Sequence, residues 1–156
     1  MAIRDVCNRR IVTVYAGTDV LKAAQLMKSE HVGDVLVLEK SPDKKQNKVI
    51  GILTDRDVVK MVVANGISPA NVLVDDIMSR SLQVVNESLG IYEVIQNMHE
   101  AGVRRMPVVS SDGSILGLVT FDDLVSLLAQ ELVKLTEIID RQIREEERTT
   151  FHLSVS

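Results

Sequence analysis

The chain has 156 residues, of which 46% are apolar, and its 18 Lys and Arg against 22 Asp and Glu give a formal charge of −4 at pH 7. This size indicates one ordinary folded domain and excludes a large multidomain enzyme. The negative charge argues against nucleic acid as a partner, and the single cysteine excludes a disulfide framework and a multi-cysteine zinc site. We expect a soluble cytoplasmic protein, because no signal-peptide-like run opens the chain and no stretch approaches the ~20 apolar residues of a membrane span.

The first half of the chain predicts the order β-α-β-β-α. A β-branched run at 11–14 precedes a stretch in which Val20, Ala23 and Met27 recur at helical spacing. Apolar runs at 35–38 and 49–53 follow and are typical of two paired strands. The Lys-rich stretch 40–48 between them has the composition of a loop. A second helix closes this unit, which ends near residues 66–69.

The second half repeats the same order at an offset of 71 residues, with a strand at 82–85, a helix that includes Ile91, Val94 and Met98, and strands at 107–109 and 115–119. From Gly51 onward the offset is 66, because the first copy carries five extra residues within 40–48. Neither half, at about 65 residues, buries much core alone. We therefore predict an α+β fold in which two pseudo-symmetric β-α-β-β-α repeats, 1–70 and 71–133, are packed sheet to sheet as one module.

The C-terminal part continues the last helical pattern. No Gly or Pro interrupts residues 124–148, and an apolar stripe includes Leu128, Leu132, Leu135 and Ile139. At ~1.5 Å per residue this helix is about 35 to 40 Å long, more than one repeat can cover. A homodimer in which the long helices touch would cover it; the alternative is a helix broken near Thr136 and folded back. Residues 134–156 form the predicted extension, with a frayed tail from 149.

The most repeated polar feature is the pattern Gly-x-x-Thr-x-x-Asp, which occurs once in each repeat where a strand passes into a helix. Its members are Gly51, Thr54 and Asp57 in repeat 1, and Gly117, Thr120 and Asp123 in repeat 2. Thr and an acid three residues later form a capping box that stabilises a helix start. The same free amides and hydroxyl also suit a phosphate, and the Asp could accept hydrogen bonds from a ribose. The pattern alone is compatible with both roles.

The tandem β-α-β-β-α order, the two Gly-x-x-Thr-x-x-Asp motifs and the strand opening Arg-Met-Pro-Val-Val at 105–109 resemble the CBS domain family. The likeness is to a stand-alone CBS pair, or Bateman module, and covers residues about 3 to 130. It implies a sensor, not an enzyme, that binds an adenosine-containing ligand such as AMP, ADP, ATP or S-adenosylmethionine in two clefts between the repeats. It also implies an unidentified protein partner that reads the bound state.

The resemblance implies which residues form each cleft. The first, here named the Asp57 cleft, would combine both repeats: Thr54, Arg56, Asp57, Gln83, Val103, Arg104 and Arg105. The second, the Asp123 cleft, would be formed by Thr13, Val32, Gly33, Asp34, Thr120 and Asp123. A unit charge at 4 Å is worth roughly 4 kcal/mol before desolvation, so the arginines favour a phosphorylated nucleotide in the Asp57 cleft. The Asp123 cleft has Phe121 and no arginine beside its motif, so it is expected to be empty or to hold a less anionic compound.

The sequence leaves a second interpretation open, in which the protein is a ligand-free dimerisation scaffold and the Thr-x-x-Asp motifs are only helix caps. Arg104 and Arg105 would then be ordinary surface residues, and Gly33 and Asp34 would mark a decayed half. We predict no catalytic residues, no metal site and no cofactor beyond the regulatory ligand. Cys7 is expected to be a small core residue, because it falls at the repeat position of Met78.

Overall fold

The computed structural model describes the backbone of residues 1–40 and 48–154. Most of the predicted loop at 40–48 therefore lies outside the described residues. The elements of repeat 1 are β1 (Thr13–Tyr15), α1 (Val20–Glu30), β2 (Asp34–Leu38), β3 (Val49–Thr54), α2 (Asp55–Val58) and the π-helix η3 (Val59–Val63). Those of repeat 2 are β4 (Val85–Asn86), α4 (Ile91–Ala101), β5 (Arg105–Val109), β6 (Ile115–Thr120) and α5 (Phe121–Ser154). Three short helices accompany them: η1 (Ile3–Asp5), η4 (Pro69–Asn71) and α3 (Val74–Ile77).

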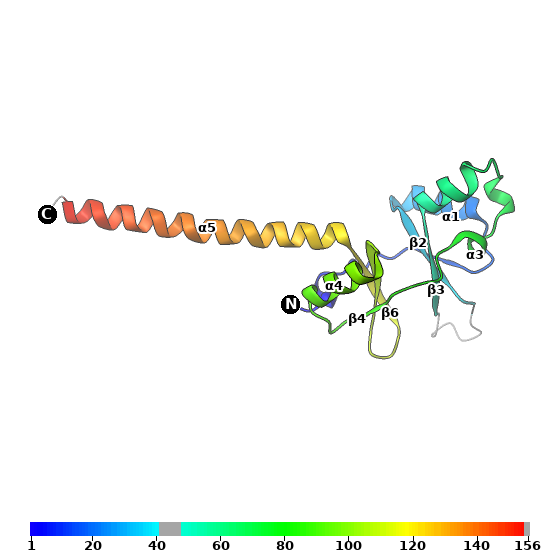
Figure 1. Ribbon diagram of the computed structural model, residues 1–156, viewed down its shortest axis with the longest axis horizontal. Coiled ribbons are helices and arrows are strands. Elements are labelled where there is room, and N and C mark those ends of the chain that lie inside the picture. Colours follow the sequence, from blue (N-terminus) through cyan, green and yellow to red (C-terminus); the bar gives the residue numbers. More distant parts are fainter. Residues whose placement is uncertain (41–47, 155–156) are drawn as a thin grey trace. The chain divides into compact units, whose positions relative to one another are not determined.

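Each repeat contains a three-stranded sheet with the same topology. The strand orders are β1-β2-β3 and β4-β5-β6; the first pair of each sheet is parallel and the second antiparallel. Both sheets also carry a register shift at the same place, between Val37 and Leu38 and between Val108 and Val109. The two halves are thus copies down to the irregularities of their hydrogen bonding, as the offset of 71 residues predicts. The predicted α+β fold of two repeats is confirmed (Figure 1).

The first helix of each repeat begins and ends where local chemistry dictates. In α1 the Asp19 side chain caps the start by accepting from the backbone amide of Lys22 at 2.8 Å. The helix ends at His31, which has a left-handed φ of 56°, and the equivalent residue after α4 is Gly102 with φ 64°. Glycine adopts this conformation without the steric cost that His31 carries. His31 therefore has a local structural role as the C-cap of α1.

The two sheets meet through a small apolar cluster. Leu36 and Ile52 of the first sheet pack with Leu118 of the second, and this contact supports the predicted sheet-to-sheet arrangement. The main chain also crosses between the halves at a close approach, where the amide of Asn8 donates to the carbonyl of Leu118 at 2.9 Å. A side chain at Gly117 would come within 2.7 Å of the Asn8 carbonyl oxygen. Only glycine leaves room for this crossing.

The helix α5 is longer than the sequence predicts. It is one continuous helix of 34 residues, about 50 Å at 1.5 Å per residue (Figure 1). The predicted fraying from 149 is wrong, because the helix continues to Ser154 and the Thr149 hydroxyl donates to the Glu145 carbonyl at 2.9 Å. No break occurs at Thr136, whose hydroxyl donates to the Val133 carbonyl at 2.7 Å within the helix.

The chain divides into two compact units, Met1–Thr120 and Phe121–Ser156. The first unit contains both sheets and every helix before α5. The domain boundaries expected after residues 70 and 133 remain predictions. Among the described residues, no helix combines the length and the apolar character needed to cross a membrane.

Candidate functional site

The junction between β3 and α2 carries the first Gly-x-x-Thr-x-x-Asp motif and forms a complete capping box. The Thr54 hydroxyl accepts from the Asp57 amide at 3.1 Å. The Asp57 Oδ2 accepts from the Thr54 amide at 2.9 Å and from the Thr54 hydroxyl at 2.7 Å. Both contacts end on one carboxylate oxygen, so Oδ1 is the oxygen left to accept from a ligand. Capping and ligand binding are therefore compatible at Asp57.

A cleft of about 240 Å³ opens beside this junction and is formed by both repeats. Its lining residues are Ile52, Thr54, Asp57, Ser79, Ser81, Leu82, Gln83, Val103, Arg104 and Arg105. Six of the seven residues expected in the Asp57 cleft are thus brought together, although they come from three separate stretches of the chain. The seventh, Arg56, is exposed and does not contribute to the lining.

Four lining residues, Ile52, Ser79, Ser81 and Leu82, were not among those expected from the sequence. A pair of backbone hydrogen bonds explains their position: the amide of Ile52 donates to Ser79 at 3.0 Å and the amide of Ser79 donates to Ile52 at 2.9 Å. This bridge holds the segment before β4 against β3. The equivalent residue of the other repeat, Asn8, makes the matching bridge to Leu118, so the two halves share this arrangement.

The predicted strand at 82–85 is partly wrong, and the error concerns the site. The strand β4 contains only Val85 and Asn86, so Gln83 lies in the loop that precedes it. Residues 81–83 line the cleft instead of extending the sheet. An alternating apolar pattern cannot distinguish a strand from a loop segment held by a neighbouring sheet.

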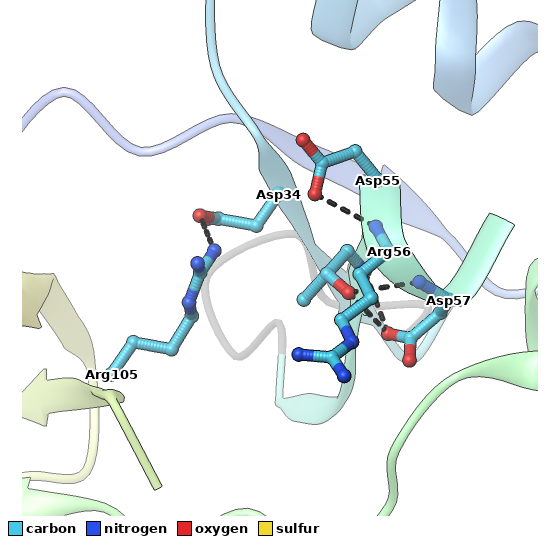
Figure 2. Close-up of polar contacts among 6 residues, drawn as sticks. Asp34, Asp55, Arg56, Asp57 and Arg105 are labelled. Atoms are coloured by element: carbon cyan, nitrogen blue, oxygen red, sulfur yellow. Dashed lines mark hydrogen bonds and ion pairs between the residues drawn. The ribbon is translucent and has the colours of Figure 1, made fainter. Parts of the chain in front are cut away.

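An ion pair joins the two repeats beside the cleft. The Arg105 guanidinium donates through Nη1 to Asp34 Oδ2, and Figure 2 shows the two side chains extending toward one another. The side chains are 17% exposed for Asp34 and 32% for Arg105. Burial raises the pKa of Asp34, the charge of Arg105 opposes this shift and the nearby Asp55 carboxylate adds to it. The sequence assigned Asp34 and Arg105 to different clefts and did not predict their contact.

The expected residues of the Asp123 cleft occupy equivalent places in the repeats. Thr13 begins β1, Val32 and Gly33 precede β2, and Thr120 ends β6. Thr120 is the ladder partner of Arg105, just as Thr54 is the partner of Asp34. These residues belong to the first compact unit and Asp123 to the second, so this cleft stays a prediction.

Other candidate groups have structural roles. Burial raises the pKa of the Cys7 thiol, which disfavours the thiolate that a nucleophile needs. In the part of the chain that the structure describes, no group of three or more His, Cys, Asp or Glu side chains could hold a metal ion. Two further hollows lie along α5 and are lined by that helix alone, so they cannot enclose a ligand.

The Asp57 cleft offers a specific set of chemical groups. Repeat 1 contributes Thr54 and Asp57 at a helix start, and repeat 2 contributes Gln83, Arg104 and Arg105. Ile52, Leu82 and Val103 supply apolar surface between them. Carboxylates accept from diols, guanidinium groups bind phosphates and apolar side chains cover flat rings. The set fits a small ligand with one apolar ring, one diol and one anionic group.

Comparison with known proteins agrees with the repeat structure. The family model of the CBS domain matches residues 3–64 and 74–130. The protein MK0525 of Methanopyrus kandleri is 29% identical over 144 residues, which cover 88% of this chain and 71% of that protein.

Two solved structures share the fold. The hexameric CBS-CP12 protein from bloom-forming cyanobacteria has a TM-score of 0.70 and 28% identity, covering 80% of this chain and 66% of that one. The CBS domain pair of protein MJ0100, in complex with 5′-methylthioadenosine and S-adenosyl-L-methionine, has a TM-score of 0.70 and 20% identity, covering 84% of this chain and 98% of that one. At 20% identity the second likeness concerns the fold alone.

Proposed function

Because the chain belongs to the CBS domain family and carries two CBS repeats in tandem, it is a regulatory module, and we propose that it binds a phosphorylated adenosine ligand in the Asp57 cleft. One observation carries this proposal. Six residues expected to contact such a ligand, contributed by both repeats, line a single cleft. The MJ0100 pair adds that this fold accommodates adenosine compounds.

The ribose and the phosphate of the ligand each have complementary side chains in the cleft. Asp57 accepts hydrogen bonds from the ribose through the oxygen that the capping box leaves available. Arg104 and Arg105 attract the phosphate, since a unit charge at 4 Å contributes roughly 4 kcal/mol at an effective dielectric of 20, before desolvation. S-adenosylmethionine lacks a phosphate and uses these arginines less well. The proposal therefore favours AMP, ADP or ATP in this cleft.

Binding would change the relation between the two repeats. The cleft of about 240 Å³ is somewhat smaller than the ~300 to 1,000 Å³ typical of ligand sites. The walls belong to different repeats, so we expect a bound nucleotide to move them apart. A sensor works through such a difference in affinity between two states. The protein partner that reads this change and the cytoplasmic location remain predictions.

We further propose that α5 associates with α5 of a second copy. Its stripe of Leu132, Leu135, Ile139 and Ile143, here named the α5 stripe, has side chains that are 50% to 63% exposed. Residues at this spacing lie on one face of a helix. Six acidic against four basic residues between 131 and 148 do not suit an anionic membrane surface. A second copy brings an identical stripe and buries both; hexameric CBS-CP12 is a relative that also assembles with itself.

Isothermal titration calorimetry tests the proposed ligand. Wild type, Asp57→Ala and Asp123→Ala are titrated with AMP, ADP, ATP, NAD and S-adenosylmethionine. We expect a phosphorylated adenosine compound to bind the wild type, Asp57→Ala to weaken it and Asp123→Ala to leave it unchanged. If no compound binds and both substitutions only lower the melting temperature, the protein is a scaffold. Turnover of a bound nucleotide would instead indicate an enzyme.

A further inference from the structure

The ion pair between Asp34 and Arg105 connects equivalent positions of the two repeats. Asp34 is the first residue of β2 and Arg105 the first residue of β5, and they are separated by the same 71 residues that align the repeats. The pair therefore joins the two sheets at matching positions. Because the two positions hold opposite charges, this contact breaks the symmetry of the module.

Arg105 has two competing uses. It is the counter-ion of Asp34, and it also lines the Asp57 cleft beside Arg104 and Gln83. A guanidinium group binds phosphate and carboxylate in the same planar, two-pronged geometry. An anionic ligand in the cleft and the Asp34 carboxylate would therefore compete for one side chain.

Asp34 depends on this counter-ion. Its side chain is only 17% exposed, and a buried charge is strongly disfavoured unless it is paired. Burial raises the pKa of Asp34, and the second carboxylate nearby, Asp55, raises it further, against the effect of Arg105. Asp55 is fixed in place because its amide donates to the Gly33 carbonyl at 2.9 Å.

We propose that Arg105 exchanges partners when an anionic ligand binds, leaving Asp34 for the ligand, so that Asp34 acts as an internal competitor of the ligand anion. This inference rests on the proposed function of the Asp57 cleft. Exchange leaves Asp34 beside Asp55 without its cation, at the position from which repeat 1 is expected to contribute to the Asp123 cleft.

Titration calorimetry with AMP and with adenosine, which lacks the phosphate, tests the exchange. Asp34→Asn removes the competitor and keeps the shape of the side chain. We expect it to strengthen AMP binding about tenfold, the factor of one charge-assisted hydrogen bond. Adenosine binding should not be strengthened, because adenosine brings no anion that competes with Asp34 for Arg105. Glu100→Gln, an exposed substitution on α4 with the same change in net charge, is the matched control and should leave AMP affinity unchanged.

A double-mutant cycle with Arg105→Gln assigns the effect to this side chain. If exchange is correct, Asp34→Asn has no effect on AMP affinity in the Arg105→Gln background. The exchange is wrong if wild type binds AMP but Asp34→Asn does not raise the affinity for AMP. It is also wrong if Asp34→Asn raises that affinity in the Arg105→Gln background. If wild type binds none of AMP, ADP, ATP and adenosine, the proposed function itself fails, and the inference fails with it.

Discussion

Replacing Asp57 with alanine should cost both stability and affinity, and the two costs can be measured separately. The carboxylate accepts two hydrogen bonds from Thr54 through Oδ2. The same group is the proposed acceptor for the ribose. Losing the capping interaction costs about 1 kcal/mol of the free energy of unfolding, within a range of ~0.5 to 2. For a chain of this size that lowers the melting temperature by about 2 to 4 °C.

The loss of affinity has a different origin and a larger expected size. A hydrogen bond to a charged group contributes about 1.5 to 3 kcal/mol, so its removal weakens nucleotide binding about ten- to a hundredfold. Thermal unfolding measures the first effect and titration calorimetry with AMP measures the second. Both are measured on one preparation at a temperature well below the unfolding transition, so that the lost stability does not reduce the folded fraction.

Glu93→Ala provides the matched control for the cap. Glu93 caps the start of α4 as Asp57 caps α2, because its Oε2 accepts from the Gly90 amide at 2.7 Å. It does not line the cleft. It should therefore lower the melting temperature by a similar amount and leave AMP affinity unchanged. The reasoning is refuted if Glu93→Ala weakens AMP as much as Asp57→Ala does, or if Asp57→Ala lowers only the melting temperature.

Three other perturbations test separate parts of the structure. Replacing Leu135 and Ile139 with Asp should convert the proposed dimer to a monomer, because the interface would bury unpaired charge, and light scattering measures the mass. Val133→Asp, outside the α5 stripe, should leave the dimer intact. An unchanged mass for the first variant contradicts the dimer. Gly117→Ala should lower the free energy of unfolding by about 1 to 3 kcal/mol in denaturant titration, because the new Cβ meets a backbone oxygen at 2.7 Å; an unchanged value would mean that this crossing is not tightly packed. The pKa of Asp34 is raised from its usual 3.8, so protonated Asp34 adds to the free energy of unfolding at a pH below 3.8. This stabilising contribution is lost as the pH rises through the raised pKa. As the pH rises through this range, the free energy of unfolding of Asp34→Asn should therefore increase relative to that of wild type. A difference between the two that stays constant with pH would contradict the raised pKa.

Much of the fold could be predicted, because the elements of each repeat follow from hydrophobic periodicity over a few residues. Helix α1 was predicted from the spacing of Val20, Ala23 and Met27. The errors lie where tertiary contacts override such patterns. Residues 82–83 have a strand-like composition but lie in a loop, because the bridge between Ile52 and Ser79 holds that segment against the cleft.

The sequence by itself determined the two repeats, the order of their elements and the two capping motifs, because hydrophobic periodicity and helix capping act over a few residues. Only the tertiary structure decided which side chains meet. The Asp57 cleft draws on residues 52–57, 79–83 and 103–105, and their approach depends on how one sheet faces the other. The contact between Asp34 and Arg105 spans 71 residues. No local pattern encodes it, because charged residues at the start of a strand are equally suited to water, and only the approach of the two sheets makes them a pair.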